Sequence, residues 1–151
     1  GRQTGGCQNV DGNANTNKAL LGYVLDGKNR MIGAIDEEDR LIGRNIFRMM
    51  RDKESQKPAL FLERYYTINY SKSFEEQIIR FAIQRAKALK VPLYSNQNVY
   101  TKNVYGGSLE SIGCNAPFEY SDAGGGMSEG KYEIAKPYIL YQPEESKKEE
   151  Y

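Results

Sequence analysis

The clearest pattern of hydrophobic and polar positions along the chain lies in residues 58–98. Residues 59–69 alternate apolar and polar side chains and are rich in aromatic and β-branched types, which favours a strand. Residues 73–91 repeat apolar side chains at helical spacing, and Pro92 ends this pattern. Residues 93–95 are a short apolar run typical of a second strand. Because a helix would join the two strands, they are predicted to run parallel through a right-handed crossover.

The start of this helix is indicated by a serine and a glutamate three residues apart. In a capping box, the serine oxygen accepts a hydrogen bond from the backbone amide three residues later, and the glutamate reaches back to the serine amide. Ser73 and Glu76 fit this motif, so the helix is predicted to begin at Ser73. Its apolar face is expected to consist of Phe74, Ile78, Ala82, Ala86 and Leu89.

The part of the chain before this unit has the pattern of an antiparallel meander. Residues 19–25 are an apolar run of strand length, and the Asp26-Gly27 pair that follows is a strong turn signal. Residues 31–35 are expected to be the returning strand. After a second turn at 36–39, residues 40–50 fit a longer, half-buried strand, for which a helix is the competing interpretation.

The pattern is weaker after residue 98. Residues 108–112 are expected to form a short helix. Residues 118–120 and 131–141 are predicted to be two strands of a hairpin whose turn is Gly124–Gly126. Pro137 would place the last strand at an edge of the sheet, because proline cannot donate to a hydrogen-bond ladder.

These elements predict an α/β fold with a mixed, α+β type of sheet: a meander, a strand-helix-strand crossover and a final hairpin. At 151 residues, one domain is expected, and it would span residues 18–141. Residues 1–17 are rich in glycine and asparagine and read as a flexible leader. Residues 142–151 read as a disordered charged tail. The chain begins with Gly1 rather than methionine, which suggests an excised domain, a processed product or a tag remnant.

The charge balance argues against a nucleic-acid or membrane partner. Twenty-one lysines and arginines face 20 acidic residues, and the formal net charge is +1. No apolar run approaches the roughly 18 residues that a membrane span requires, so a soluble chain, with the cytoplasm favoured, is expected. The two cysteines, Cys7 and Cys114, are interpreted as reduced thiols, with a single disulfide as the alternative in an exported protein.

The chain has no histidine, and this excludes several kinds of site within it. Ser-His-Asp and Cys-His nucleophile pairs, histidine general bases and HExxH zinc sites all require imidazole. No metal site is expected. Residues 11–17 carry the alternating oxygen ligands of a calcium loop, but the glycine at the sixth position and the closing acid are missing, so a linker is the better interpretation. Any catalysis would depend on Glu, Asp, Tyr, Lys or a thiol.

The order of elements over roughly residues 18–140 resembles the GNAT acyltransferase superfamily. Residues 24–27 and 39–43 look like the central hairpin strands of that family, and residues 86–93 are similar to its main helix leading into the next strand. Residues 103–109, followed by Ile112 and Gly113, look like its Asn-x-x-Ala…Leu-Tyr…Gly-Phe segment.

This resemblance implies a domain that binds acetyl-CoA or another acyl-CoA and transfers the acyl group to an amine. The implied catalytic residues are Glu63 as base and, as general acid in place of the family's late tyrosine, Tyr105, with Tyr100 as the alternative. The chain departs from the family where the glycine-rich pyrophosphate loop should lie, because residues 69–74 contain no glycine, and the late tyrosine has no clean counterpart. The residues implied to bind the cofactor are Tyr70, Ser71, Lys72, Ser73 and Asn103.

Two alternatives remain open from the sequence. Glu63 can also be an exposed strand carboxylate balanced by Arg64 or another cation. The whole domain can be a non-catalytic protein-interaction module on an acyltransferase-like scaffold, or a fragment of a larger protein. In that case Arg44 and Arg48, which would share a face of a strand, are the expected contacts for a protein partner. The oligomeric state is left open.

Overall fold

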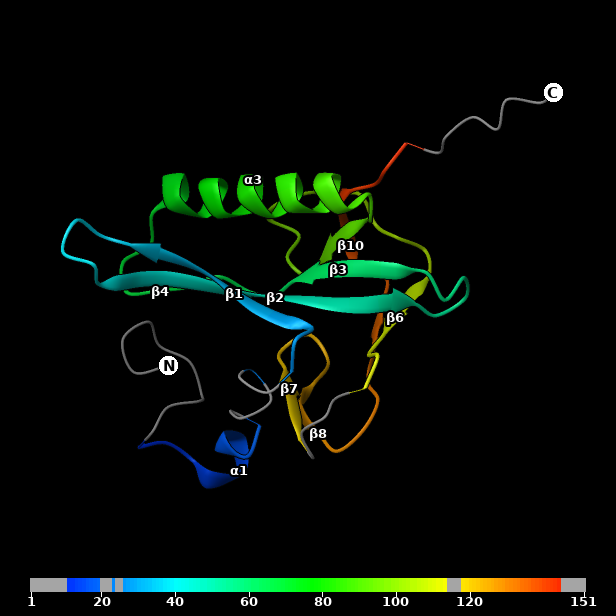
Figure 1. Ribbon diagram of the computed structural model, residues 1–151, viewed down its shortest axis with the longest axis horizontal. Coiled ribbons are helices and arrows are strands. Elements are labelled where there is room, and N and C mark those ends of the chain that lie inside the picture. Colours follow the sequence, from blue (N-terminus) through cyan, green and yellow to red (C-terminus); the bar gives the residue numbers. More distant parts are fainter. Residues whose placement is uncertain (1–10, 20–22, 24–25, 114–117, 145–151) are drawn as a thin grey trace.

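The computed structural model describes residues 11–19, 23, 26–113 and 118–144, which form a mixed sheet with one long helix against it (Figure 1). The other residues, among them Cys7, Cys114 and most of the expected leader and tail, lie outside the described part. The elements are α1 (Ala14–Asn17), β1 (Asn29–Ile35), β2 (Leu41–Asp52), β3 (Pro58–Leu62), β4 (Tyr66–Thr67), α3 (Lys72–Leu89), β5 (Leu93–Ser95), β6 (Ser108–Glu110), β7 (Glu119–Ser121), β8 (Gly126–Ser128), β9 (Glu133–Ala135) and β10 (Tyr138–Tyr141).

The first hairpin is formed by β1 and β2, which pair antiparallel. Its turn is organised by Asp36, whose Oδ1 accepts hydrogen bonds from the amides of Glu38 and Arg40, each at 2.9 Å. The predicted strands at 31–35 and 40–50 are therefore confirmed, and the helical interpretation of 40–50 is wrong. Most of the strand expected at 19–25 lies outside the described residues, and its described members, Ala19 and Tyr23, are not in strands.

The predicted crossover is present. β3 pairs antiparallel with β2 and parallel with β5, with Leu60 opposite Leu93, and α3 joins the two parallel strands. The helix ends at Leu89 because Lys90 adopts a left-handed conformation, with φ 55°, from which its amide reaches the carbonyls of Ala86 and Lys87.

The strand expected over residues 59–69 is interrupted. β3 ends at Leu62, and β4 pairs separately with β2 at Gly43 and Arg44. Between the two strands, the chain turns its polar and aromatic groups inward, where Asn45 Nδ2 donates to the carbonyl of Glu63 at 2.7 Å. Tyr65 packs directly on Gly43, at which a Cβ would lie 2.4 Å from the Tyr65 hydroxyl oxygen. The inward turn of these buried residues therefore breaks the ladder.

The N-cap of the helix lies two residues earlier than the capping-box motif indicated. Ser71 is the N-cap, and its hydroxyl oxygen accepts from the amide of Phe74 at 3.5 Å. Ser73 lies inside the first turn, and its hydroxyl accepts from Gln77 Nε2 at 3.4 Å. The capping box of Ser73 and Glu76 is therefore wrong, and Glu76 forms a long ion pair of 3.8 Å with Lys72 instead.

The carboxyl-terminal half differs most from expectation. Residues 108–110 form β6 rather than a helix, because they pair with the end of β2 on one side and with β9 on the other. The glycine-rich turn closes a short hairpin of β7 and β8, not one between 118–120 and 131–141. The single strand expected at 131–141 is wrong, because Pro137 separates β9 from β10. β10 pairs antiparallel with β5 at one end of the strand order, and Tyr138 also forms an isolated antiparallel bridge with Val104.

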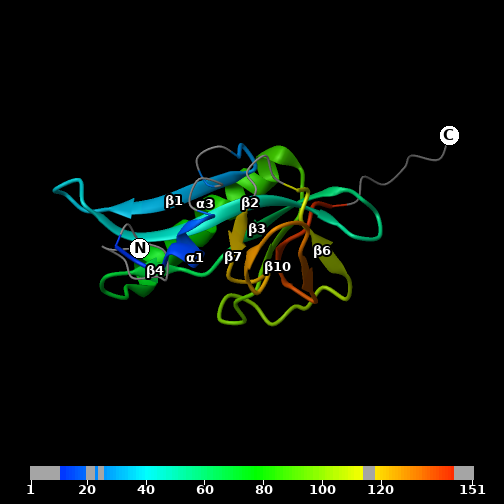
Figure 2. The ribbon, with the colours of Figure 1, turned by 90° about the horizontal axis from the view of Figure 1, so that it is seen from below.

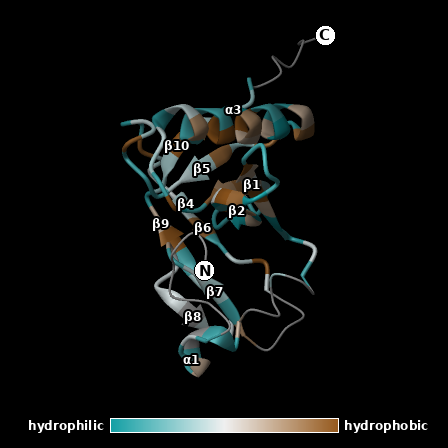
Figure 3. Cartoon of the chain, turned by 90° about the vertical axis from the view of Figure 1, so that its left-hand side faces the viewer, coloured by the Kyte–Doolittle hydropathy of each residue, from teal (hydrophilic) through white to brown (hydrophobic). Residues whose placement is uncertain are grey.

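The sheet has the strand order β10-β5-β3-β2-β6-β9, and β1 and β4 also pair with β2. β9 and β10 are consecutive in the chain although they lie at opposite ends of this order, so the sheet curls upon itself (Figure 2). The curled sheet encloses one buried core, and α3 covers the opposite face with a second core. Figure 3 shows α3 on one side of the sheet and the β7–β8 hairpin with α1 on the other. The first core consists of Met50, Ala59, Phe61, Tyr94, Leu109, Tyr132 and Ile134.

In the part of the chain that the structure describes, no helix combines the length and the hydropathy that crossing a bilayer requires.

Candidate functional site

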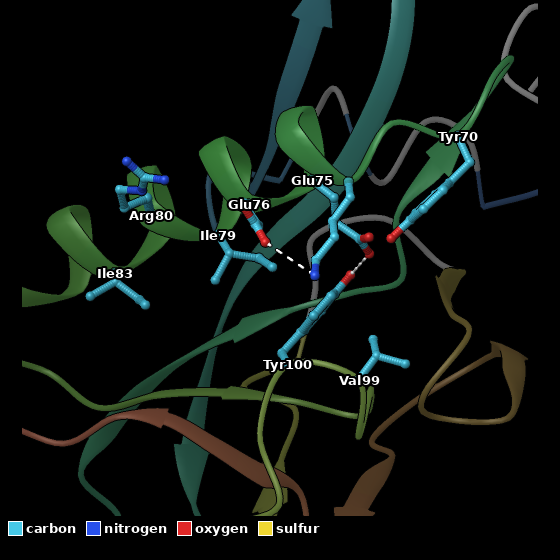
Figure 4. Close-up of a pocket in the computed structure, with 9 residues that line it drawn as sticks. Tyr70, Glu75, Glu76, Ile79, Arg80, Ile83, Val99 and Tyr100 are labelled. Atoms are coloured by element: carbon cyan, nitrogen blue, oxygen red, sulfur yellow. Dashed lines mark hydrogen bonds and ion pairs between the residues drawn. The ribbon is translucent and has the colours of Figure 1, made fainter.

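A pocket of about 330 Å³, the α3 pocket, lies where the parallel strands end (Figure 4). One wall is the amino-terminal half of α3, with Tyr70 and Lys72 at its start, and the other is formed by Val99 and Tyr100, which follow β5. In open α/β sheets, ligands bind in the crevice outside the carboxyl ends of parallel strands. The α3 pocket therefore occupies the position at which this fold type is expected to receive a ligand.

Helical spacing determines which side chains α3 presents to the pocket. Glu75, Ile79 and Ile83 follow one another at intervals of four residues and line one stripe of the helix, while Glu76 and Arg80 form the neighbouring stripe. The pocket thus combines an aliphatic wall with charged groups of both signs.

A buried carboxylate and two tyrosines meet at the inner end of the pocket. The Tyr100 hydroxyl donates to Glu75 Oε1 at 2.6 Å, and Figure 4 shows the Tyr70 hydroxyl turned toward the same carboxylate. Burial raises the pKa of Tyr100 strongly, and the hydrogen bond to Glu75 raises it further. Hydrogen bonding with Glu75 is also the main reason why the pKa of Tyr70 is raised. Both phenols therefore stay protonated at neutral pH.

The residues expected to bind a cofactor do not all lie at this pocket. Tyr70 and Lys72 line it, whereas Ser71 and Ser73 are not among its lining residues. Asn103 belongs to the segment that runs along β10, where its carbonyl accepts from the amide of Ile139 at 2.7 Å. Only part of the expected set therefore comes together.

A second group of polar residues is fully enclosed. Arg48, with no exposed surface, donates through Nη1 to Glu119 Oε1 at 2.8 Å and to the Tyr132 hydroxyl at 2.9 Å, and through Nη2 to the carbonyl of Tyr120 at 2.8 Å. Its Nε lies 3.2 Å from Glu63 Oε1, an ion pair without hydrogen-bond geometry. We call Arg48, Glu63 and Glu119, with Asp26 and Lys28, the buried ion cluster.

Lys28 extends the buried ion cluster toward the segment before β1. Its ammonium lies 3.1 Å from Glu119 Oε2 and 3.0 Å from Asp26 Oδ2, and it also donates to the carbonyl of Gly113. The Lys28 side chain is 4% exposed, so this cation is as enclosed as its partners. Glu119 therefore bridges two buried cations.

Glu63, the expected base, belongs to this cluster and is 3% exposed. Ser121 donates its hydroxyl to Glu63 Oε1 at 2.6 Å. Burial raises the pKa of Glu63, and the nearby Arg48 guanidinium opposes that rise. Glu63 is not a lining residue of the α3 pocket. The alternative of an exposed carboxylate balanced by Arg64 or another cation is wrong about the exposure, whereas another cation, Arg48, does pair with Glu63.

The expected partner-binding pair is also separated. Arg48 is wholly buried, so the prediction that it offers its guanidinium to a protein partner is wrong. Arg44 is half-buried and lies with its guanidinium carbon 4.9 Å from the centre of the Tyr66 ring. Only Arg44 remains available at the surface.

Tyr105, the expected general acid, lies at the far end of the sheet from Glu63. Its hydroxyl donates to Asp52, which raises the pKa of Tyr105 to about 12. Asp52 is the last residue of β2 and lies beside the start of β3, whereas Glu63 follows the end of β3. Five residues of strand separate the two ends by about 16 Å. Tyr105 and Glu63 therefore cannot serve one reacting centre.

Sequence reasoning missed most of the buried ion cluster. The sequence did contain a signal that Arg48 is buried. Ile46 and Met50 lie two residues before and after it, and this spacing places all three side chains on the same face of a strand. No comparable signal marks Glu119, which lies 71 residues from Arg48 and meets it only through the fold.

Comparison with protein-family models, with curated proteins and with solved structures found no match. Within the described ranges, no group of three or more histidine, cysteine, aspartate or glutamate side chains is arranged to hold a metal ion.

Proposed function

We propose that the chain is a GNAT-like domain that binds an acyl-CoA thioester in the α3 pocket. The observation that carries this proposal is the position of the pocket, at the carboxyl ends of the parallel strands β3 and β5, with Lys72 and Arg80 beside an aliphatic wall. The strand order β1-β2-β3-β5-β10, with a single helix-joined parallel pair inside it, supports an acyltransferase-like scaffold.

The pocket residues fit some parts of such a ligand better than others. Lys72 and Arg80 can attract phosphate groups, Ile79 and Ile83 offer apolar surface to the pantetheine arm, and the exposed ring of Tyr70 can stack on the adenine. The helix start is less suited to phosphate, because Ser71 already caps the amide of Phe74. Binding would therefore rest on side-chain cations and apolar contact rather than on free amides.

The chemistry available at the α3 pocket differs from the expected pair. Glu63 and Tyr105 do not line it, whereas Tyr100 and Glu75 do. The Tyr100 hydroxyl already donates a hydrogen bond of 2.6 Å to Glu75. The proposal therefore assigns any proton movement at this site to Tyr100 and Glu75. The raised pKa of Tyr100 makes it a weak acid, so slow transfer is expected at neutral pH.

Isothermal titration with acetyl-CoA tests the proposal. We expect measurable binding by the natural chain, and at least a tenfold loss of affinity in the Lys72→Ala/Arg80→Ala variant, because the ligand phosphates lose both cations. Arg85→Ala is the matched control, since Arg85 is an exposed α3 cation outside the pocket, and it should bind normally. Absence of heat and of thermal stabilisation at millimolar acetyl-CoA would contradict the proposal.

A second candidate is a non-catalytic interaction module on the same scaffold. The observation that favours it is that β3 and β5 stay paired over the whole of β5, from Leu60 opposite Leu93 to Leu62 opposite Ser95, leaving no gap between them there. The measurement that separates the candidates is release of free CoA thiol from acetyl-CoA in the presence of amines. Release that is lost in Tyr100→Phe supports an enzyme, and binding without release supports a module.

A further inference from the structure

β1 is an edge strand in the described part of the chain, where it pairs only with β2 and its other hydrogen-bonding side meets no strand. The carbonyl of Lys28 accepts from Met49, and the amide of Asp36 donates to Arg40, so the even-numbered residues of β1 face β2. Successive residues of a strand direct their amides and carbonyls to opposite edges. The amides and carbonyls of Met31, Gly33 and Ile35 therefore face outward.

Within the described residues, this edge lacks most of the usual protection against pairing, and its one irregularity is a register shift against β2 between Ala34 and Ile35. Natural proteins blunt edge strands with proline, lysine, bulges or a covering segment. Residues 29–35 contain no proline or lysine, and Met31 and Ile35 are 55% and 59% exposed. Between them, the Leu41 side chain covers Gly33, and its Cδ1 would lie 2.9 Å from a Cβ at position 33. The outward edge is thus an exposed, apolar stretch.

The apolar surface continues from this edge onto α3. A groove of about 440 Å³ lies between β1 and the helix, and Phe74 and Phe81 line it from the helix side. These two phenylalanines are 38% and 50% exposed. Exposed apolar surface that runs on from an unpaired strand edge is typical of an interface between proteins.

We propose that the occupant of this edge is a second copy of the same chain, joined antiparallel through β1 about a two-fold axis at Gly33. Antiparallel pairing places outward-facing residues opposite outward-facing residues, so Gly33 of each copy meets Gly33 of the other, and Met31 meets Ile35. This register satisfies the free amides and carbonyls of all three residues in both copies. It forms one continuous sheet with the two α3 helices on the same side.

The charges at the ends of β1 are complementary in this register. Arg30 is exposed, and within the described residues no carboxylate forms an ion pair with it. Pairing about Gly33 places Arg30 of one copy opposite Asp36 of the other at both ends of the shared ladder, where Asp36 also keeps its ion pair of 2.8 Å with Arg40 of its own copy. Opposite charges that face each other across strands favour pairing. An unrelated strand would not supply this self-complementary set, so the second copy is the occupant that fits.

The oligomeric state in solution tests the proposal. Light scattering after size exclusion should give twice the 17.1 kDa mass of one chain, and the Met31→Lys/Ile35→Lys variant should give a single chain. Leu89→Lys is the matched control, because Leu89 is 53% exposed at the far end of α3, and it should remain a dimer. Circular dichroism should show that each variant is folded. A monomeric natural chain, or a dimer that survives the double lysine variant, would overturn the proposal.

A cross-linking experiment tests the register itself. In a background with Cys7 and Cys114 replaced by serine, Met31→Cys/Ile35→Cys should form disulfide-linked dimers on mild oxidation, because opposite residues of a ladder lie within disulfide range. Met31→Cys alone should not, since the two copies of residue 31 would lie about 13 Å apart along the strand. Efficient cross-linking by Met31→Cys alone would place the axis elsewhere and contradict the pairing about Gly33.

Discussion

Arg48 lies in the interior of the curled sheet, where an unpaired charge would be very unfavourable. Its guanidinium forms ion pairs with Glu63 and Glu119 and donates a hydrogen bond to the carbonyl of Tyr120. A guanidinium can make these contacts together because its donors form a planar fork, which the single ammonium of lysine does not reproduce. The position therefore requires arginine rather than positive charge in general.

This requirement predicts the behaviour of two substitutions at position 48. Arg48→Ala should lower the free energy of unfolding by about 3–5 kcal/mol, because it leaves buried carboxylates without their cation. Arg48→Lys should recover only a small part of the loss. Urea unfolding followed by circular dichroism gives both values. Arg40→Ala is the control, since Arg40 pairs with Asp36 at a side-chain exposure of 65% and should cost under about 1 kcal/mol.

A lysine variant with the stability of the natural chain would contradict this account of the buried ion cluster. It would show that a positive charge alone stabilises the buried ion cluster, without the guanidinium hydrogen bonds to Glu119, Tyr132 and Tyr120.

At the scale of elements, the start of α3 distinguishes two serines that look alike in the sequence. Ser71→Ala should lower the free energy of unfolding by about 0.5–2 kcal/mol, because the amide of Phe74 loses its acceptor. Ser73→Ala should change stability little, since Ser73 lies inside the first turn and alanine has the higher helix propensity. Thermal unfolding of the two variants checks the order. A larger loss for Ser73→Ala would restore the capping box at Ser73 and Glu76.

The elements that the sequence predicted are those whose structure is decided locally. α3 has its own apolar stripe and stop signal, and β2 and β3 have long or strongly apolar patterns. β6 has only three residues, and its conformation depends on β2 and β9, which are distant in the sequence. The prediction of a hairpin between 118–120 and 131–141 was wrong for the same reason, because β9 and β10 pair with different strands. Long-range pairing is information that periodicity does not contain.

In the candidate site, too, the sequence indicated what is decided locally and missed what depends on contacts between distant residues. Tyr70 and Lys72 were expected to bind a cofactor because the resemblance implies a cofactor site at the start of this helix, and both line the α3 pocket. Tyr105 and Tyr100 were alternatives for the general acid, because the choice between them depends on how the segment after β5 folds back against α3. The pairing of Glu63 with Arg48 likewise crosses two strands, and a single sequence carries no signal of which cation a strand carboxylate will meet.

At the scale of the whole molecule, the curled sheet places phenol groups in its interior and makes stability depend on alkaline pH. The chain has 12 tyrosines, and burial is the main cause of raised pKa values at Tyr23, Tyr94 and Tyr132. A phenol with a raised pKa keeps its proton in the folded state at a pH where the unfolded chain has lost it. Rising pH then favours the unfolded chain.

Tyr23 allows this effect to be measured, because burial raises its pKa to about 12 from an ordinary value of 10.0. The folded state binds more protons than the unfolded state between these two values, so stability should fall as pH rises from 10 to 12, by about 2 kcal/mol from this group. Tyr23→Phe removes the ionisable group and the hydrogen bond of 3.3 Å to the carbonyl of Tyr120. The variant should therefore be less stable at pH 8 but lose less stability between pH 10 and 12. Urea unfolding at four pH values gives the change in the free energy of unfolding with pH for each protein. Equal slopes for the natural chain and the variant would show that the pKa of Tyr23 does not differ between the folded and unfolded states.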